Sequence, residues 1–105
     1  MLDEASLRDI AGQLKAAQDG VQQIAPISAM LPGFDDDAAY RVLHLIHDAR
    51  LSEGWRPIGR KIGFTNRLIW PVYNVHQPIW GYVYDRTVLH IGNAAAVLPI
   101  GRFTE

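Results

Sequence analysis

The sequence predicts an α+β fold in which two helices come first and short strands and turns follow. In two segments of the first half, apolar residues recur at three- and four-residue steps, the period of one helix face. From Trp55 onward, short apolar pieces alternate with Gly, Pro and Asn, which is the pattern of strands and tight turns. With 49% hydrophobic and 20% charged residues, residues 1–105 have the size and composition of a single globular domain.

The first helix is expected from about Asp3 to Asp19. Asp3 or Ser6 can cap its start, because a short polar side chain accepts a hydrogen bond from a free backbone N–H there. Gly20 can cap its end. The apolar face of this helix consists of Leu7, Ile10, Ala11, Leu14 and Ala17.

Residues 21–34 contain two prolines and a glycine among apolar residues, which predicts an extended connector lying against an apolar surface. Asp35, Asp36 and Asp37 follow, and they suit the cap and first turn of a second helix because the helix dipole favours negative charge there. A hard-cation site is the alternative for these acids, although they lack the spacing of an EF-hand loop. The second helix is expected to end near Glu53 and Gly54 and to bury Ala38, Val42, Leu45, Ile46 and Ala49.

Four short strands are expected in the second half, at residues 60–64, 81–84, 87–91 and 95–100, with a turn at Gly92 and Asn93 before the last. Residues 65–74, between the first two strands, predict a short helix capped by Thr65 and interrupted by Pro71.

Charge and composition exclude several classes of partner. Ten Lys and Arg face 11 Asp and Glu, giving a net charge of −1 without the basic stripe that binds phosphate backbones, so no nucleic acid is expected. The absence of Cys excludes a disulfide framework and a thiolate metal site. The N-terminus lacks the basic region of a secretory signal, and no stretch approaches the roughly 18 consecutive apolar residues of a membrane span. The sequence therefore predicts a soluble cytoplasmic protein without membrane contact.

Two groups of side chains have both a functional and a structural interpretation. His44 and His47 lie three residues apart on the second helix, where they are either metal ligands on one face or ordinary surface histidines. The aromatic residues of the chain either stack on a planar ligand or form core and interface. They are Tyr40, Trp55, Trp70, Tyr73, Trp80, Tyr82 and Tyr84.

Lys61 is the strongest candidate for chemistry. Gly59 and Gly63 on either side of it allow a close approach of the backbone to a ligand, and the lysine can project its ammonium group into a pocket. The alternative is an edge-strand lysine that discourages aggregation.

The lysine motif and the segments around it resemble a known family, the 2-keto-4-pentenoate hydratase and 4-oxalocrotonate decarboxylase branch of the fumarylacetoacetate hydrolase superfamily. Its G-x-K-[IV]-G-[LF]-T segment is matched by Gly59, Lys61, Ile62, Gly63, Phe64 and Thr65. Its A-Y-x-V helix is matched by Ala39, Tyr40 and Val42, and its P-x-[FW]-G turn falls on the run QPIWG, residues 77–81. The likeness spans nearly all 105 residues and corresponds to the N-terminal part of the family's fold.

The resemblance implies a metal-dependent lyase of aromatic catabolism. Members hydrate a 2-hydroxydienoate or decarboxylate a related acid, with Mg²⁺ or Mn²⁺ chelating the substrate oxygens. Lys61 would be catalytic, holding the substrate's negative charge or assisting proton transfer, and Gly63, Thr65 and Trp80 would bind the substrate. The implied partners are a small 2-keto acid and either identical subunits or a further chain segment.

Two departures from the family's pattern qualify this interpretation. Ile79 stands where the family has an aspartate that takes part in acid–base work, and an isoleucine cannot move protons. The family's metal-binding carboxylates follow the strand that corresponds to residues 95–100, beginning with a Glu-x-Glu pair that this chain, ending at Glu105, does not contain. We therefore expect the N-terminal segment of a longer enzyme, without the metal ligands and inactive alone.

Two other classes of function stay open. The chain could be a stand-alone interaction or oligomerisation module whose aromatic half packs against a partner. It could also be a non-catalytic protein that binds a 2-keto acid through Lys61, which would be consistent with Ile79.

Overall fold

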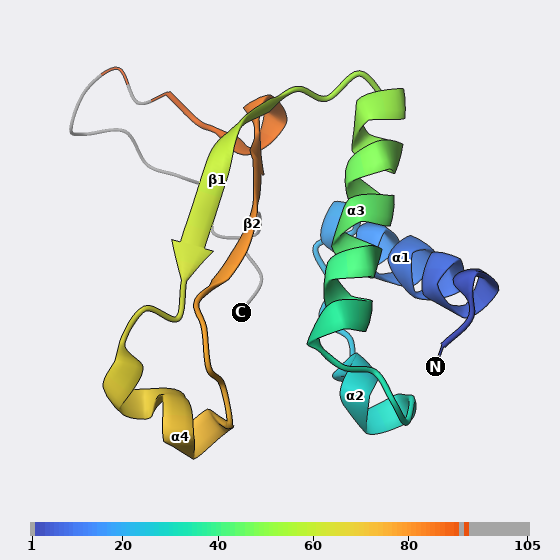
Figure 1. Cartoon of the computed structure of the whole chain (residues 1–105). Coiled ribbons are helices and arrows are strands. Elements are labelled where there is room, and N and C mark those ends of the chain that lie inside the picture. Colours follow the sequence, from blue (N-terminus) through green and yellow to red (C-terminus); the bar gives the residue numbers. More distant parts are fainter. Residues whose placement is uncertain (1, 91, 93–105) are drawn as a thin grey trace. The chain divides into compact units, whose positions relative to one another are not determined.

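The computed structural model describes residues 2–90 and Gly92, and its helices and antiparallel strands confirm the α+β class (Figure 1). The helices are α1 (Glu4–Asp19), α2 (Ile27–Met30), α3 (Asp36–Ser52) and α4 (Trp70–Tyr73), the 3₁₀ turns are η1 (Arg67–Ile69) and η2 (Asp85–Thr87), and the strands are β1 (Pro57–Gly63) and β2 (Ile79–Tyr84). These elements form two compact units, which hold residues 2–50 with Gly92 (unit 1) and residues 51–90 (unit 2). The expectation of one domain or an N-terminal segment stays a prediction.

Helix α1 has the predicted bounds within one residue. The Asp3 carboxylate accepts a hydrogen bond from the backbone N–H of Ser6 at 2.8 Å, so Asp3 is the cap. Leu7, Ile10 and Ala11 on the predicted face are buried, and Leu7 is completely inaccessible to solvent.

Gly20 caps the end of α1, as predicted, but it is not the left-handed residue of this helix end. Gly20 occupies the capping position with an ordinary helical φ of −85°, and the left-handed residue is Val21, with φ of +52°. The backbone N–H groups of Val21 and Gln22 donate to the carbonyls of Gln18 and Ala17, at 3.2 and 2.9 Å, which is the Schellman pattern of helix termination. A β-branched residue is strained in this conformation, where glycine is usual.

The connector contains a short helix that the proline-rich sequence did not predict. Pro26 precedes the single turn of α2, which buries Ile27. Leu31 and Phe34 pack against the same core, so the predicted contact of the connector with an apolar surface is confirmed.

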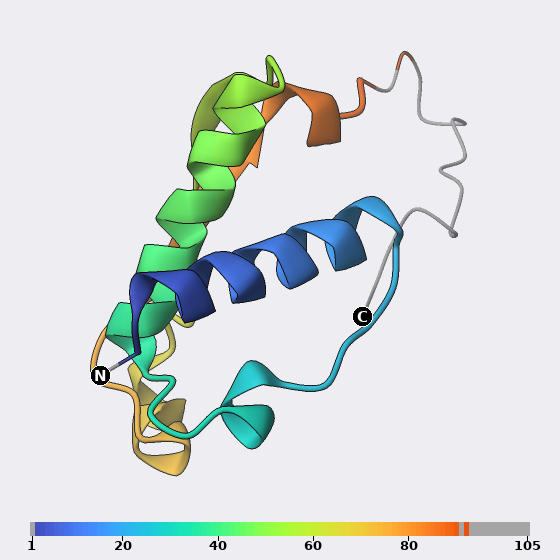
Figure 2. The same cartoon turned by 90° about the vertical axis from the view of Figure 1, so that its right-hand side faces the viewer.

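Helix α3 begins where the aspartates predicted it. The Asp35 carboxylate accepts from the backbone N–H of Ala38 at 2.9 Å, and Asp36 and Asp37 lie in the first turn. In both ribbon views α1 crosses α3, with α2 near the beginning of α3 (Figure 2). The core of unit 1 lies between them and consists of Leu7, Ile10, Ala11, Ile27, Ala38 and Val42, against which Leu45 and Ile46 also pack.

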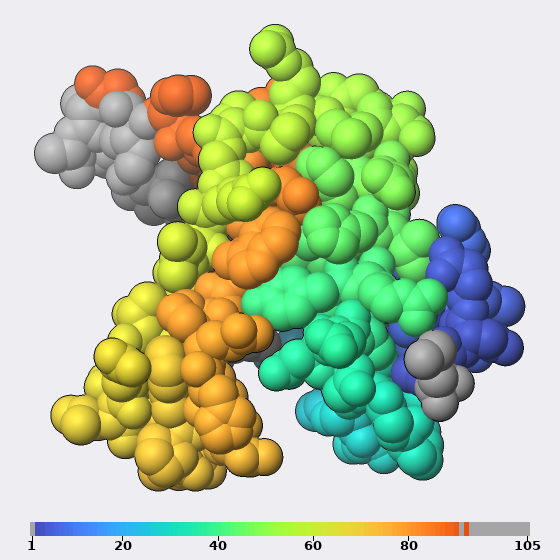
Figure 3. All heavy atoms as spheres, in the orientation of Figure 1, coloured from blue at the N-terminus to red at the C-terminus, as the bar shows by residue number. Residues whose placement is uncertain are grey.

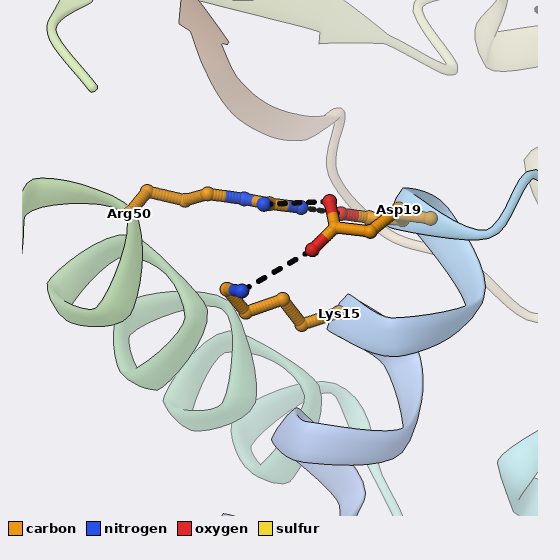
Figure 4. A network of polar contacts seen from close by, with 4 residues as sticks. Lys15, Asp19 and Arg50 are labelled. Carbon is orange, nitrogen blue, oxygen red and sulfur yellow. Dashed lines mark hydrogen bonds and ion pairs between the residues drawn. The ribbon is translucent and has the colours of Figure 1, made fainter. Parts of the chain in front are cut away.

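A buried arginine joins the ends of α1 and α3, and nothing in the sequence pattern predicted it. The Arg50 side chain is only 4% exposed, and its guanidinium donates to the Asp19 carboxylate at 2.7 Å and to the Gln18 amide oxygen at 3.1 Å (Figure 4). Lys15 reaches the same carboxylate at 3.2 Å. Burial alone would raise the pKa of Asp19, but the hydrogen bonds and charges of Arg50 and Lys15 hold this pKa below its ordinary value.

Unit 2 is an antiparallel hairpin closed by a helical connection. Strands β1 and β2 pair with Lys61 opposite Gly81, and a bulge interrupts the register between Pro57 and Gly59. The first two predicted strands are thus confirmed, with β1 beginning three residues and β2 two residues earlier than expected. No helix formed by the described residues has the length and apolar character of a membrane span.

The predicted helix between the strands is present, but two of its details were wrong. Its cap is Asn66, whose side chain accepts from the backbone N–H of Leu68 at 3.1 Å, and not Thr65. Pro71 does not interrupt it, because the proline lies in the first turn of α4, where its missing N–H has no helical partner to lose.

The strand predicted at residues 87–91 is wrong for the part that the structure describes. Thr87 ends η2, and residues 88–90 have no regular structure. The chain turns here because the Asp85 carboxylate accepts from the backbone N–H of Arg56 at 3.0 Å and the Thr87 hydroxyl donates to the Tyr84 carbonyl at 3.0 Å. The strand predicted at residues 95–100 and Asn93 of the predicted turn lie outside the described residues.

Val21→Gly should raise the free energy of unfolding of unit 1 by about 1 kcal/mol, because glycine adopts the left-handed conformation without strain. Chemical denaturation followed by helical circular dichroism measures this change. Val21→Ala is the matched control and should gain less, since alanine keeps a Cβ. A loss of stability in Val21→Gly would show that the apolar contacts of Val21 outweigh its strain.

Asp19→Asn should lower the free energy of unfolding near neutral pH by about 2 kcal/mol, because it leaves the buried Arg50 guanidinium without its charged partner. The lowered pKa of Asp19 means that the native carboxylate stabilises the fold above its ordinary value of 3.8 and loses this effect as the pH falls through the lowered value. Denaturation of both proteins across this range should therefore show the difference shrinking in acid. Asp9→Asn, at an exposed position of α1, should have little effect, and an Asp19→Asn deficit that persists undiminished in acid would contradict the ionic explanation.

Candidate functional site

Lys61 lies at the centre of one face of the hairpin. Because strand neighbours alternate between faces, Lys61 shares its face with Gly59 and Gly63 along β1 and with Gly81 directly across on β2. Val83 and Ile79, opposite Gly59 and Gly63, complete this face. We call these six residues, Gly59, Lys61, Gly63, Ile79, Gly81 and Val83, the lysine face.

A shallow hollow of about 410 Å³ lies against the lysine face. Its lining includes Lys61 and Gly63 of β1, Ile79–Val83 of β2 and Thr87. Three of the four residues predicted to form the site, Lys61, Gly63 and Trp80, therefore line one hollow. Thr65 is exposed beyond the end of β1 and does not belong to the described lining.

Nothing in the local structure requires glycine at the two glycine positions of β1 on the lysine face. A Cβ built on Gly59 meets no atom within 4 Å, and one built on Gly63 makes an ordinary contact with Ile79 Cγ1 at 3.7 Å. Neither glycine has a positive φ. Since glycine weakens a strand, these positions indicate a surface kept clear for the close approach of another group. Sequence reasoning missed Gly81 because its place opposite Lys61 depends on the strand register.

The opposite face of the hairpin carries arginine and aromatic side chains. The Arg60 guanidinium lies 4.8 Å from the centre of the Trp80 ring and 5.6 Å from that of Tyr82. Trp80 and Tyr82 meet edge to face at 5.2 Å, as do Tyr84 and Trp55 at 5.7 Å. These contacts hold β2 from behind the lysine face.

The lysine motif contains a strained residue directly after Gly63. Phe64 has a φ of +56°, which is uncommon for a bulky residue. Two contacts hold it there: the Trp70 indole N–H donates to the Phe64 carbonyl at 2.8 Å, and the Tyr73 ring meets the Phe64 ring edge to face at 5.4 Å. The turn that follows Gly63 is therefore fixed by the helical connection, and no sequence signal indicated it.

The described residues do not fit the divalent metal that the family resemblance implies. Within residues 2–90 and Gly92, no three His, Asp or Glu side chains come together in a group that could hold a metal ion. His44 and His47 lie on α3 without a third ligand of this kind, and Asp35 serves as a helix cap. Ile79 lines the hollow, and an isoleucine supplies neither a ligand nor a proton.

Gly59→Ala should keep the fold and strengthen the hairpin by up to about 1 kcal/mol, because the new methyl group enters open space and restricts the unfolded chain. Hydrogen exchange of the β1 and β2 amides measures the gain as slower exchange. Gly54→Ala is the control and should destabilise unit 2, since Gly54 has a φ of +86°. Faster exchange in Gly59→Ala would mean that the glycine is a structural requirement.

Comparisons with known proteins agree with the lysine motif. No protein-family profile matches the chain. The chain is 34% identical over 84 residues to a 2-keto-4-pentenoate hydratase of Burkholderia vietnamiensis, covering 80% of this chain and 32% of the relative. A 2-keto-4-pentenoate hydratase of Dechloromonas aromatica is 39% identical over 86 residues, which cover 82% and 33% of the two chains. A 2-hydroxypent-2,4-dienoate hydratase of Pseudomonas putida is 30% identical over 99 residues, with coverage of 91% and 43%.

The fold also has solved counterparts. The structures of 4-oxalocrotonate decarboxylase from Pseudomonas putida G7, one complexed with calcium and acetate and one with magnesium and adipate, match this chain with a TM-score of 0.78 at 23% identity. The match covers 82% of this chain and 33% of the decarboxylase. The chain thus spans about a third of the length of the first relatives and solved structures that it matches. It is therefore related to the 2-keto-4-pentenoate hydratase and 4-oxalocrotonate decarboxylase branch, as its lysine motif and the segments around that motif predicted.

Proposed function

We propose that this chain is the N-terminal portion of a 2-keto-4-pentenoate hydratase-like enzyme, a lyase that adds water to a 2-hydroxydienoate, and that it is inactive alone. The observation that carries the proposal is the position of Lys61 at the centre of a face whose neighbouring positions are glycines. The hydratase relatives, each matched over about a third or somewhat more of its length, support the reaction class.

Lys61 would act on the anionic end of the substrate. Its ammonium group attracts a carboxylate or an enolate oxygen, and the open space over Gly59 leaves room for a flat acid to lie close to β1. The hollow of about 410 Å³ is in the size range of small-molecule sites. The solved decarboxylase was complexed with acetate or adipate, which supports a carboxylate ligand for this fold.

The chain's share of the chemistry is limited to substrate binding and charge stabilisation. The decarboxylase complexes with calcium or magnesium support a divalent metal in the whole enzyme, magnesium or manganese by the family resemblance. The described residues offer no donor group for it, so we assign no step through the metal to this chain. Among the residues of the lysine face that line the hollow, Lys61 is the titratable one.

Gly63 would contribute to the substrate site from the lysine face, Trp80 would contribute through its place on β2 beside the hollow, and Thr65 would contribute from the turn at Phe64 that the helical connection fixes. We further propose that the whole enzyme works in the cytoplasm, in aromatic catabolism, as a homo-oligomer or through pairing with a further chain segment. The relatives, which are hydratases by name, favour this function over a stand-alone interaction module or a non-catalytic 2-keto acid binding protein.

A chimaera in which this chain replaces the matching third of the Burkholderia vietnamiensis hydratase tests the proposal. With Mg²⁺ present, the chimaera should hydrate 2-hydroxypenta-2,4-dienoate, and the 105-residue chain alone should not. The loss of dienoate absorbance measures the reaction. Lys61→Ala should lower kcat/KM by at least about 100-fold, because the substrate's negative charge loses its cation. Arg60→Gln removes the adjacent cation of the opposite face and should change kcat/KM less than about threefold. Turnover by the isolated chain, or an active Lys61→Ala chimaera, would contradict the proposal.

A further inference from the structure

All buried residues of the described chain belong to unit 1. They are Leu7, Ile10, Ala11, Ile27, Ala38, Val42 and Arg50, whereas every residue of unit 2 is at least partly exposed. A two-stranded hairpin without a core is at best marginally stable in water. Unit 2 therefore needs a surface beyond its own residues.

The most exposed apolar side chains of the described chain lie on the helical connection of unit 2. Leu68 is 88% exposed and Val72 is 78% exposed. They are four residues apart, Leu68 in η1 and Val72 in α4, which follow one another without a break. In the space-filling view this connection projects, yellow to orange, at one end of the hairpin (Figure 3). We call Leu68 and Val72 the apolar knob.

The apolar knob is presented on a fixed segment. The Asn66 side chain caps η1, the Trp70 indole holds the Phe64 carbonyl, and the backbone N–H of Val75 donates to the Trp70 carbonyl at 3.0 Å. An ordered helical turn with two apolar side chains at this spacing is suited to a hydrophobic groove on another surface.

Charge favours one occupant. Residues 51–90 carry five Lys and Arg against two acids, in a chain whose net charge is −1. Arg67, next to the knob, lies over the Trp70 ring at 5.5 Å. A second copy of unit 2 would bring the same positive charge to the contact, whereas an apolar groove with an acidic rim would complement it.

We propose that Leu68 and Val72 dock into an acid-rimmed apolar groove on the polypeptide that carries the remaining two-thirds of the hydratase-type enzyme. The inference rests on the proposed function. The decarboxylase alignment leaves out less than a fifth of this chain, so it includes part of unit 2, and it accounts for only a third of the decarboxylase. The other two-thirds are the surface that the apolar knob requires.

Thiol labelling of single-cysteine variants tests this docking, since the native chain contains no Cys. Leu68→Cys should react with a maleimide at least about tenfold more slowly in the hydratase chimaera than in the isolated chain, because docking buries the side chain. Mass spectrometry of the peptide separates its labelling from that of other thiols. Ile24→Cys is the matched control, an exposed apolar position of unit 1, and should react at similar rates in both proteins.

The paired variant Leu68→Asp with Val72→Asp gives a second readout. It should lower the Tm of the chimaera by about 5 °C or more and leave the isolated chain nearly unchanged, because the acids meet the acidic rim only in the chimaera. Three results would overturn the docking: equal labelling rates in the two proteins, an unchanged Tm of the chimaera, or a chimaera that does not fold.

The remaining outcomes separate this inference from its alternatives. Labelling of the isolated chain that becomes faster on dilution would identify a second copy as the occupant and also overturn the docking. A folded, slowly labelled but inert chimaera would contradict only the proposed function, and an active chimaera with a fully reactive Leu68→Cys would contradict only the docking.

Discussion

The buried guanidinium of Arg50 is the interaction on which the packing of unit 1 depends. Asp19 ends α1, where a carboxylate is opposed by the helix dipole, and it is stable there because Arg50 and Lys15 surround it with positive charge. Arg50 in turn lies in the last turn of α3, where the dipole favours a cation. One ion pair therefore satisfies both helix ends and fixes where α1 and α3 meet. The apolar side chains between the two helices then have only to pack against one another, since the buried guanidinium already has its hydrogen-bond partners.

Unit 2 is held together by local contacts, because none of its residues is buried. Its turns are held by side chains that bond the backbone: Asp85 to Arg56, Trp70 to Phe64, and Arg86 to the Glu53 carbonyl. Such bonds define a conformation, but each contributes only about 1 kcal/mol to stability. The candidate functional lysine thus stands on the part of the chain that is well defined in shape and poorly supplied with buried apolar area. This combination is expected of a surface that is completed by another one.

The sequence predicted what depends on local periodicity and capping. The helix faces of Leu7 and Val42 follow from 3.6-residue spacing, and Asp3 and Asp35 follow from cap chemistry. The single turn of α2 was missed because four residues are too few for a period, and the predicted strand at 87–91 failed because the Asp85 carboxylate bonds a residue 29 positions away. In the site, Lys61 and its flanking glycines were visible along the chain. Gly81 and Arg50 were not, because strand register and tertiary burial decide their surroundings.

The glycines around Lys61 also set a limit on how strongly the lysine face can hold a ligand. A lysine with glycines before, after and directly across from it has only the diagonal side chains of Ile79 and Val83 on its face of the sheet to restrict its rotamers. Ordering its four-carbon stem against an anion costs up to about 2 kcal/mol of conformational entropy, close to what one charge-assisted hydrogen bond returns. The uncovered backbone that admits a flat acid is thus also the reason that capture by this hairpin would be weak and short-lived. Tight binding requires a further protein surface that packs against the Lys61 side chain and restricts its rotamers.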